Sequence, residues 1–356
     1  MKIPSPFFVL LIVFLLSASE LFAAPALYSA EVPVADSSPE ARKASIGQAF
    51  QQVLIKASGH RDLKGRVEME GLREHAEDYV QQFRYRDEIA ETEGEPDKRW
   101  LWVAFEKTAV ERALHKLGLS VWEQGRPEVL LWLAQESDGQ RVLLNPEQDT
   151  MLVQALTSTA EQRGLPLLLP IMDLEDQAAL RVSDIWVVYR ESIERASARY
   201  GQQLILLGRL RRAGNQWHAK WTMLLPDRQQ EFSSVASSRE ETVSSGIHEA
   251  MDWLADQYVP GSDTSQQESV ILRFLGVDDF RDYSRLIQLF DTLDIVSEYA
   301  VQESSDDQLL VQAKVQGGLD ILRQRLSLES ELAPVVSIPD DETTAPGKLE
   351  LSYRLR

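Results

Sequence analysis

A short stretch of this sequence concentrates positive charge within an otherwise acidic chain. From Gln203 to Pro226 it reads QLILLGRLRRAGNQWHAKWTMLLP, and its basic residues are Arg209, Arg211, Arg212 and Lys220. An arginine side chain can hold a carboxylate or a phosphate through two parallel hydrogen bonds. Such a strip could therefore bind an anionic ligand or dock an acidic partner surface. The alternative is a soluble hairpin whose outward positions simply carry charge.

Two tryptophans accompany the basic residues. Trp217 and Trp221 fall on one face of the second predicted strand, because alternate residues of a strand share a face. They could belong to the core or offer a stacking surface to a ligand. As a hypothesis, the partner-binding site comprises Arg209, Arg211, Arg212, Lys220 and Trp217.

Residue patterns typical of catalytic or metal sites are absent from the sequence. The histidines are far apart, at positions 60, 75, 115, 218 and 248, and the nearest approach to a zinc-protease helix, HEAMD at His248, has Asp252 where a second histidine is required. Neither a GxSxG nucleophile motif nor a phosphate-binding glycine loop occurs. One acidic cluster could bind a divalent cation, or its members could cap helices in a solvated loop: Asp173, Glu175, Asp176 and Asp184. We predict no metal and no cofactor.

The elements that must position the basic strip belong to a predicted middle domain, residues 121–260. EVLLWLAQ, bounded by Pro127 and Asp138, is typical of a strand covered on both faces. A helix marked by residues 152–159, with Gly164 to end it, leads to a strand starting PLLLPI, which indicates a β-α-β unit. QLILLGRLRR and QWHAKWTMLLP then form a hairpin around AGN, EFSSVAS adds a strand, and residues 243–258 form a closing helix.

Smaller domains are predicted on either side. In residues 27–120, a strand from Tyr28 to Val34 precedes a helix that Ser38 caps and Gly59 ends. A second helix over residues 72–83, a hairpin and a third helix follow. Residues 268–336 indicate a split β-α-β domain with Asp278 as a helix cap, and the tail, 337–356, ends in a strand. The predicted fold class is α/β, with three small α/β sandwich domains.

Composition and the N-terminus suggest where the protein works. The formal net charge of −19 argues against nucleic acid as a partner, since phosphate binding needs a positive surface. FFVLLIVFLL, from Phe7 to Leu16, follows Lys2 and precedes small residues at 23–26, which predicts a signal peptide over residues 1–26. The alternative is an uncleaved N-terminal anchor. With no cysteine and no other long apolar run, the mature chain is expected to be a periplasmic protein without a membrane segment.

Three segments carry a resemblance to a known family. They are ALYSAEVPVADSSPEARKASIGQAFQQVLIKASG, RPEVLLWLA and ASARYGQQLILLGRLRRAGNQWHAKW. Together they resemble an uncharacterised family of exported bacterial proteins, domain of unknown function two-thousand-sixty-six. The layout is more distantly similar to the flagellar outer-membrane ring protein FlgT and to the N-terminal domain of TolB. That resemblance implies a TolB-like middle domain and a scaffolding or partner-binding role in the envelope, and it transfers no functional residue.

The sequence therefore predicts a non-enzymatic periplasmic protein that binds or scaffolds an envelope component, either a protein or a glycan. Two alternatives stay open. One is a cryptic hydrolase that uses paired carboxylates, which would require such a pair in a deep pocket. The other is a small-ligand sensor, which would be stabilised against heat by its ligand.

Overall fold

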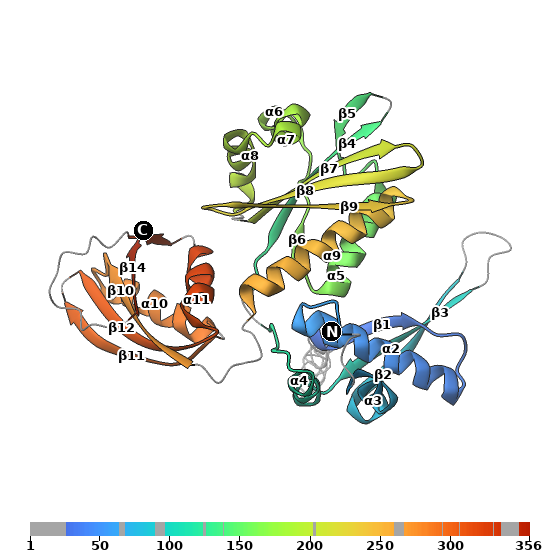
Figure 1. The fold of residues 1–356 in the computed structure, drawn as a ribbon, viewed down its shortest axis with the longest axis horizontal. Helices are drawn as coiled ribbons and strands as arrows, with labels where there is room; N and C mark the ends of the chain where they lie inside the picture. Colours follow the sequence, from blue (N-terminus) through green and yellow to red (C-terminus); the bar gives the residue numbers. More distant parts are fainter. Residues whose placement is uncertain are drawn as a thin grey trace, which may run out of the picture. The chain divides into compact units, whose positions relative to one another are not determined.

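The computed structural model describes residues 26–63, 68–89, 97–123, 126–137, 139–201, 204–259, 267–293, 295–305, 307–329, 331–335 and 349–356. Within them the chain is of mixed α/β character and contains three separate sheets (Figure 1). It divides into two compact units, residues 1–53 with 71–110, and residues 54–70 with 111–356. The predicted α/β fold class is confirmed. Most of the predicted signal peptide, residues 1–25, and the segment 339–347 lie outside the described residues.

The first unit contains an antiparallel sheet in the order β1-β3-β2. Its strands are β1 (Ser29–Pro33), β2 (Val80–Glu88) and β3 (Lys98–Phe105), and the nearby helices are α2 (Pro39–Ser58), α3 (Glu68–Glu74), the 3-10 turn Ala76–Tyr79 and α4 (Lys107–Lys116). Phe50 of α2 is buried, with its ring centroid 4.9 Å from that of Tyr79 and 5.0 Å from that of Phe105. Ser38 caps α2 as predicted, since its Oγ accepts from the amide of Ala41.

The helix predicted over residues 72–83 is wrong in its second half. The chain leaves the 3-10 turn at Tyr79 and enters strand β2 at Val80, so Phe83 belongs to the sheet. A register shift between Val80 and Gln82 explains the error. The extra residue at the shift lets apolar residues three positions apart share one face of the strand, and that spacing resembles a helical period.

The second unit contains the middle sheet, whose order is β5-β4-β7-β8-β9 with the short β6 beside β4. Strand β4 runs parallel to β6 and β7, and the other neighbours are antiparallel. The strands are β4 (Val129–Ser137), β5 (Gln140–Leu143), β6 (Leu167–Leu168), β7 (Leu204–Ala213), β8 (Gln216–Leu224) and β9 (Gln229–Ala236). The predicted β7–β8 hairpin and the strand after it are confirmed, whereas β6 is much shorter than predicted.

Helices cover both faces of the middle sheet, and two hydrophobic cores result. One core lies between the sheet and α5 (Thr150–Arg163) with α9 (Arg239–Tyr258), and it includes Leu131 of β4 and Trp221 of β8. The other lies between the opposite face and α6 (Leu174–Ala179), α7 (Val182–Val187) and α8 (Arg190–Ser197), and it includes Trp132 of β4. Gly164, at φ 65°, ends α5 as predicted.

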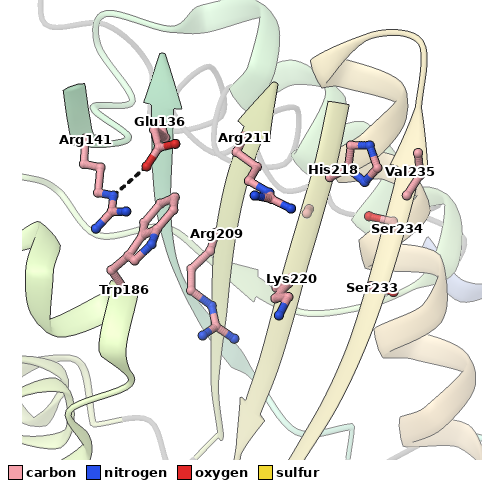
Figure 2. Close-up of a pocket in the computed structure, with 11 residues that line it drawn as sticks. Glu136, Arg141, Trp186, Arg209, Arg211, His218, Lys220, Ser233, Ser234 and Val235 are labelled. Atoms are coloured by element: carbon pink, nitrogen blue, oxygen red, sulfur yellow. Dashed lines mark hydrogen bonds and ion pairs between the residues drawn. The ribbon is translucent and has the colours of Figure 1, made fainter. Parts of the chain in front are cut away.

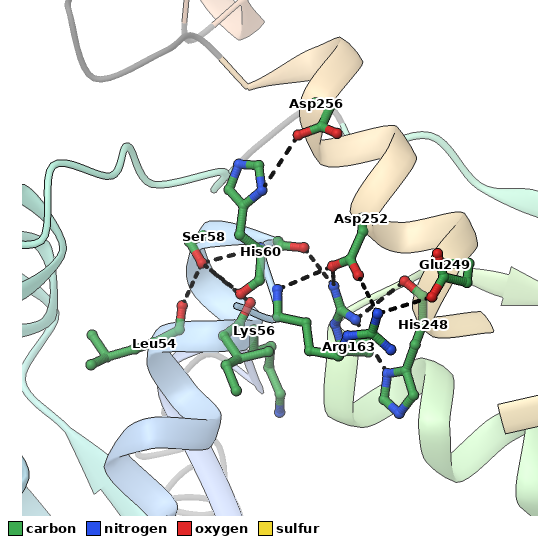
Figure 3. A network of polar contacts seen from close by, with 12 residues as sticks. Leu54, Lys56, Ser58, His60, Arg163, His248, Glu249, Asp252 and Asp256 are labelled. Carbon is green, nitrogen blue, oxygen red and sulfur yellow. Dashed lines mark hydrogen bonds and ion pairs between the residues drawn. The ribbon is translucent and has the colours of Figure 1, made fainter. Parts of the chain in front are cut away.

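A polar network within the second unit joins residues 59–61 to helices α5 and α9 (Figure 3). The guanidinium of the buried Arg163 donates to the carbonyl of Gly59 at 2.6 Å and to Oδ1 of Asp252 at 2.6 Å. The amide of Arg61 donates to the same Asp252 oxygen at 3.0 Å. These contacts are charge-assisted, and the one to Gly59 is buried, so together they hold this segment against the two helices.

The third sheet also lies in the second unit and has the order β11-β12-β10-β14-β13. Its strands are β10 (Gln267–Leu275), β11 (Val296–Ser305), β12 (Gln308–Gln316), β13 (Leu332–Pro334) and β14 (Leu349–Leu355), and its helices are α10 (Phe280–Thr292) and α11 (Gly318–Ser327). The strand predicted in the tail is β14, which pairs in parallel with β10. Asp279, rather than the predicted Asp278, caps α10 by accepting from the amides of Arg281 and Asp282.

No helix in the described part of the chain is long and apolar enough to cross a membrane.

Candidate functional site: a basic groove on the middle sheet

The face of the middle sheet that carries α6–α8 is only partly covered. Along β7, Ile205, Leu207, Arg209 and Arg211 point to this face because they alternate with residues of the opposite face. The first two are buried in the core with the helices, and the arginines continue beyond it. A groove of about 430 Å³ lies there (Figure 2), lined by Glu136, Arg141, Trp186, Arg209, Arg211, His218, Ala219, Lys220, Ser233, Ser234 and Val235.

Strand pairing arranges the groove residues in two rows across the sheet. In the first row Arg141, Glu136, Arg211, His218 and Val235 occupy paired positions on β5, β4, β7, β8 and β9. The second row places Arg209, Lys220 and Ser233 on β7, β8 and β9. Cross-strand partners have side chains only about 5 Å apart at Cβ. The register therefore brings the cations of three strands, together with His218, onto one surface.

Arg209 is the most buried cation of the groove. Its side chain is 13% exposed, and its Nη2 donates to Oγ1 of Thr222 at 2.7 Å. The nearest carboxylate, Glu231, stands 3.9 Å away, and Nε has no hydrogen-bond partner within the described residues. Burial lowers the pKa of the Arg209 guanidinium, and the charge of Glu231 opposes that change. The positive charge is thus largely shielded from water, and its one carboxylate partner, Glu231, stands at the outer limit of ion-pair distance.

Arg141, Glu136 and Trp186 form one side of the groove. Nε of Arg141 donates to the Glu136 carboxylate at 2.7 Å, and the Arg141 guanidinium carbon lies 4.1 Å from the centroid of the Trp186 ring. Such a cation–π contact holds the guanidinium against the indole. Glu136 is therefore neutralised by Arg141, and the charges of Arg209, Arg211 and Lys220 remain to face an incoming group (Figure 2).

The structure separates the predicted site residues into two groups. Arg209, Arg211 and Lys220 line the groove. Arg212 and Trp217 pair with each other across β7 and β8 on the opposite face, where Trp217 packs against the core shared with α5 and α9. Arg212 is exposed there. The basic strip is continuous in sequence but lies on two faces because neighbouring residues of a strand point in opposite directions.

Sequence reasoning missed Arg141, Glu136, Trp186 and His218 as groove residues. A signal for β5 existed, because Asp138-Gly139 between two apolar runs is typical of a hairpin turn, and Gly139 indeed has φ 78°. That hairpin would have placed Arg141 beside β4. Trp186 had no such signal, since only the packing of α7 against the sheet brings it to the groove.

Three of the four acidic residues predicted as possible ligands of a divalent cation form hydrogen bonds with arginines of the same chain. Arg199 donates to Asp173 at 2.8 Å and to the buried Asp176 at 3.1 Å, and Asp173 also caps α6. The Arg199 hydrogen bond lowers the pKa of Asp173 to about 2. Asp184 of α7 accepts from Arg181, the residue that precedes this helix. The described residues contain no group of three or more histidines and acids arranged to hold a metal ion.

Comparison with known protein families finds a match to one uncharacterised family. A family model described as domain of unknown function DUF8605 matches residues 23–123. No curated protein matches the chain. A solved structure titled "Crystal structure of uncharacterized protein" aligns with 37% of this chain and 92% of its own, at 11% identity and a TM-score of 0.19. This match agrees with the expectation of an uncharacterised family, whereas the particular family named from the sequence and the likeness to FlgT and TolB stay predictions.

Proposed function

We propose that this protein is a non-enzymatic binding protein of the bacterial envelope, and that its basic groove holds an anionic group of its partner. The observation that carries the proposal is Arg209, a largely buried guanidinium whose nearest carboxylate is 3.9 Å away. Shielding a charge from water costs free energy, and Glu231 at 3.9 Å offsets that cost only weakly. A carboxylate or phosphate in the groove would supply that counter-charge.

The chemistry of the lining supports binding over hydrolysis. A hydrolase that uses paired carboxylates needs two acids in one pocket, whereas the groove lining contains a single carboxylate, Glu136, which is held by Arg141. Ser234 is also engaged, since its Oγ accepts from Trp221 Nε1 and donates to the carbonyl of Thr242. The groove thus presents mainly hydrogen-bond donors and positive charge, which suit an anion.

The cellular setting of the proposal comes from the sequence. The apolar run of residues 7–16 followed by small residues supports export. The resemblance to exported proteins, and to envelope scaffolds such as FlgT and TolB, supports a partner in the same compartment. The periplasm is therefore where the binding partner should be sought.

Cross-linking in cells, followed by purification of a tagged chain and mass spectrometry, tests this function. The variant is Arg211→Gln with Lys220→Gln, and the matched control is Arg212→Gln, which removes a charge from the opposite face of the same hairpin. Each charge-assisted hydrogen bond contributes about 1.5–3 kcal/mol, so the double variant should recover the main partner at least about tenfold less. Arg212→Gln should recover it at the wild-type level. Equal recovery from all three folded proteins would overturn the proposal.

A further inference from the structure

We propose that the partner is an extended acidic peptide that joins the middle sheet as an additional strand along the outer edge of β9. This inference rests on the proposed function of the groove and names the partner class. Strand addition combines main-chain hydrogen bonds, which give affinity, with side-chain pockets at alternate positions, which give specificity. Strand β9 and the groove next to it supply both parts.

The outer edge of β9 is open within the described residues. The strand lies at the end of the sheet order and pairs with β8 alone. The amide of Leu225 donates to the carbonyl of Arg228 across the β8–β9 turn, so that pair is hydrogen-bonded. Hydrogen-bonded and non-bonded pairs alternate in an antiparallel ladder. Ser233 and Val235 therefore occupy non-bonded pairs with Lys220 and His218, and their main-chain groups point outward.

Strand β9 has few of the features by which edge strands usually prevent pairing. Proteins protect such edges with prolines, bulges, inward-pointing charges or very short strands. Strand β9 has eight residues, QQEFSSVA, with no proline and no register shift against β8, and its one charge, Glu231, lies on the groove face at 3.9 Å from Arg209. By contrast β5, at the other edge, has four residues and one cation, Arg141. The less protected edge, β9, thus also borders the basic groove.

The side chains of an added strand would meet the groove at every second position. Ser233 and Val235 point to the groove, so their neighbours on an added strand would do the same. Lys220 lies on the next strand inward, paired with Ser233. Strands are about 4.8 Å apart, and Ser233 is small, so a glutamate side chain can extend over it toward the Lys220 ammonium. An acidic residue therefore fits the position beside Ser233, and Glu231, two residues earlier on the same face, disfavours a second one beside itself.

The intervening side chains of the peptide would face the opposite side of the sheet. There the neighbouring β9 residue is Phe232, which is partly buried and stacks on Trp221 with ring centroids 6.3 Å apart. A small apolar residue such as valine suits that position. The predicted recognition pattern is therefore acidic and apolar residues in alternation, which is also the pattern that favours a strand.

A blocked synthetic peptide of four Glu-Val repeats is the probe. Its binding to the full-length protein is measured by fluorescence anisotropy, and amide hydrogen exchange is followed on β9. A peptide of the same composition with its four glutamates in one block is the control. We expect the alternating peptide to bind at least tenfold more tightly and to slow exchange at Ser233 and Val235. Absence of that protection would overturn strand addition.

Substitutions separate this inference from the function on which it rests. Ser233→Pro removes one outward amide, and proline is tolerated at edge positions whose amide faces solvent. We expect it to weaken the alternating peptide at least tenfold, as Arg211→Gln with Lys220→Gln does, while Arg212→Gln changes binding less than twofold. If Ser233→Pro does not fold, the exchange measurement on the wild type decides.

Two further outcomes distinguish failure of strand addition from failure of the proposed function. If the double variant weakens partner capture in cells while neither peptide binds, strand addition is overturned and the anion-binding groove stands. If the double variant leaves partner capture unchanged, the proposed function itself is overturned.

Discussion

Arg163 and Arg209, two arginines of the second unit whose side chains are 2% and 13% exposed, differ in how closely a carboxylate approaches them. Arg163 and Arg209 each have a pKa lowered by burial, and the Nε of each lacks a hydrogen-bond partner in the described part of the chain. Arg163, however, contacts Asp252 at 2.6 Å and a backbone carbonyl at the same distance. Arg209 has its nearest carboxylate at 3.9 Å. Arg163 is thus closely paired within the fold, whereas in the proposed function an anion of the partner would supply the closer counter-charge for Arg209.

His248, next to Arg163, makes stability depend on pH. Its Nδ1 lies 3.2 Å from Nη1 of Arg163, so a neutral ring can accept a hydrogen bond there. Burial, followed by the charges of Arg163 and Arg61, lowers the pKa of His248 to about 4, against the opposing effect of Asp252 and Glu249. Between about pH 6.5 and pH 4 the unfolded state therefore binds more protons than the folded state. Stability is greatest above that window and falls as the pH decreases through it.

His248→Gln should reduce this pH dependence, because glutamine can still accept from Arg163 but does not titrate. We expect the wild type to lose on the order of 1 kcal/mol more unfolding free energy than the variant between pH 7.5 and pH 5, allowing for the partial solvent access of the ring. Urea unfolding at the two pH values measures the difference. Equal losses in both proteins would contradict the assignment.

At the scale of elements, Trp221 explains two glycines in the interiors of β7 and α9. A Cβ at Gly246 of α9 would lie 2.1 Å from Cε2 of Trp221, and one at Gly208 of β7 would lie 2.3 Å from Cδ1 of Leu133 and 2.7 Å from Cζ3 of Trp221. The indole is fully buried, and its Nε1 donates to Ser234 Oγ at 2.9 Å. The helix and the strand can approach this ring only where no side chain intervenes, so close packing outweighs the helix preference for alanine.

Gly246→Ala should destabilise the protein even though alanine is the better helix former. Overpacking of a core costs about 1–3 kcal/mol, which exceeds the gain of about 0.5–1 kcal/mol from replacing a helical glycine. The matched control is Gly71→Ala in α3, where the added Cβ would meet no atom within 4 Å. We expect calorimetry to show a lower unfolding temperature for the first variant and an equal or higher one for the second. A stabilised Gly246→Ala protein would refute the packing argument.

The elements that the sequence predicted well are those with strong local signals. The β7–β8 hairpin has alternating residues around Gly214, and α5 ends at a left-handed Gly164. Prediction was wrong where tertiary pairing decides the outcome. Phe83 joined a strand because β3 pairs with it, and β6 is limited to the two residues that pair with β4. Neither effect is visible in local periodicity.

For the whole molecule, the groove is a local exception to a strongly acidic chain of formal net charge −19. The sequence predicted Arg209, Arg211 and Lys220 because they are close along one hairpin. It could not predict that Arg141 and Trp186, from β5 and α7, complete the same groove, because the sheet order that unites them arises from long-range pairing. It also grouped Arg212 with Arg211, although the strand places them on opposite faces.

The contrast between the basic groove and the acidic chain predicts how binding of the peptide depends on salt concentration. An acidic peptide is repelled by the molecule as a whole and attracted by the groove at short range. The screening length falls from about 10 Å at 0.1 M salt to about 3 Å at 1 M. Screening weakens both effects, but only the attraction depends on Arg211 and Lys220.

The ratio of wild-type affinity to that of Arg211→Gln with Lys220→Gln should therefore decrease with salt. With the Glu-Val peptide we expect a ratio of at least about tenfold at 0.05 M and below about threefold at 1 M, measured by anisotropy titration. The same ratio for Arg212→Gln should stay near one throughout, because that side chain lies on the far face. A large ratio that persists at 1 M salt would mean that the two groove residues act through packing and not through their charge.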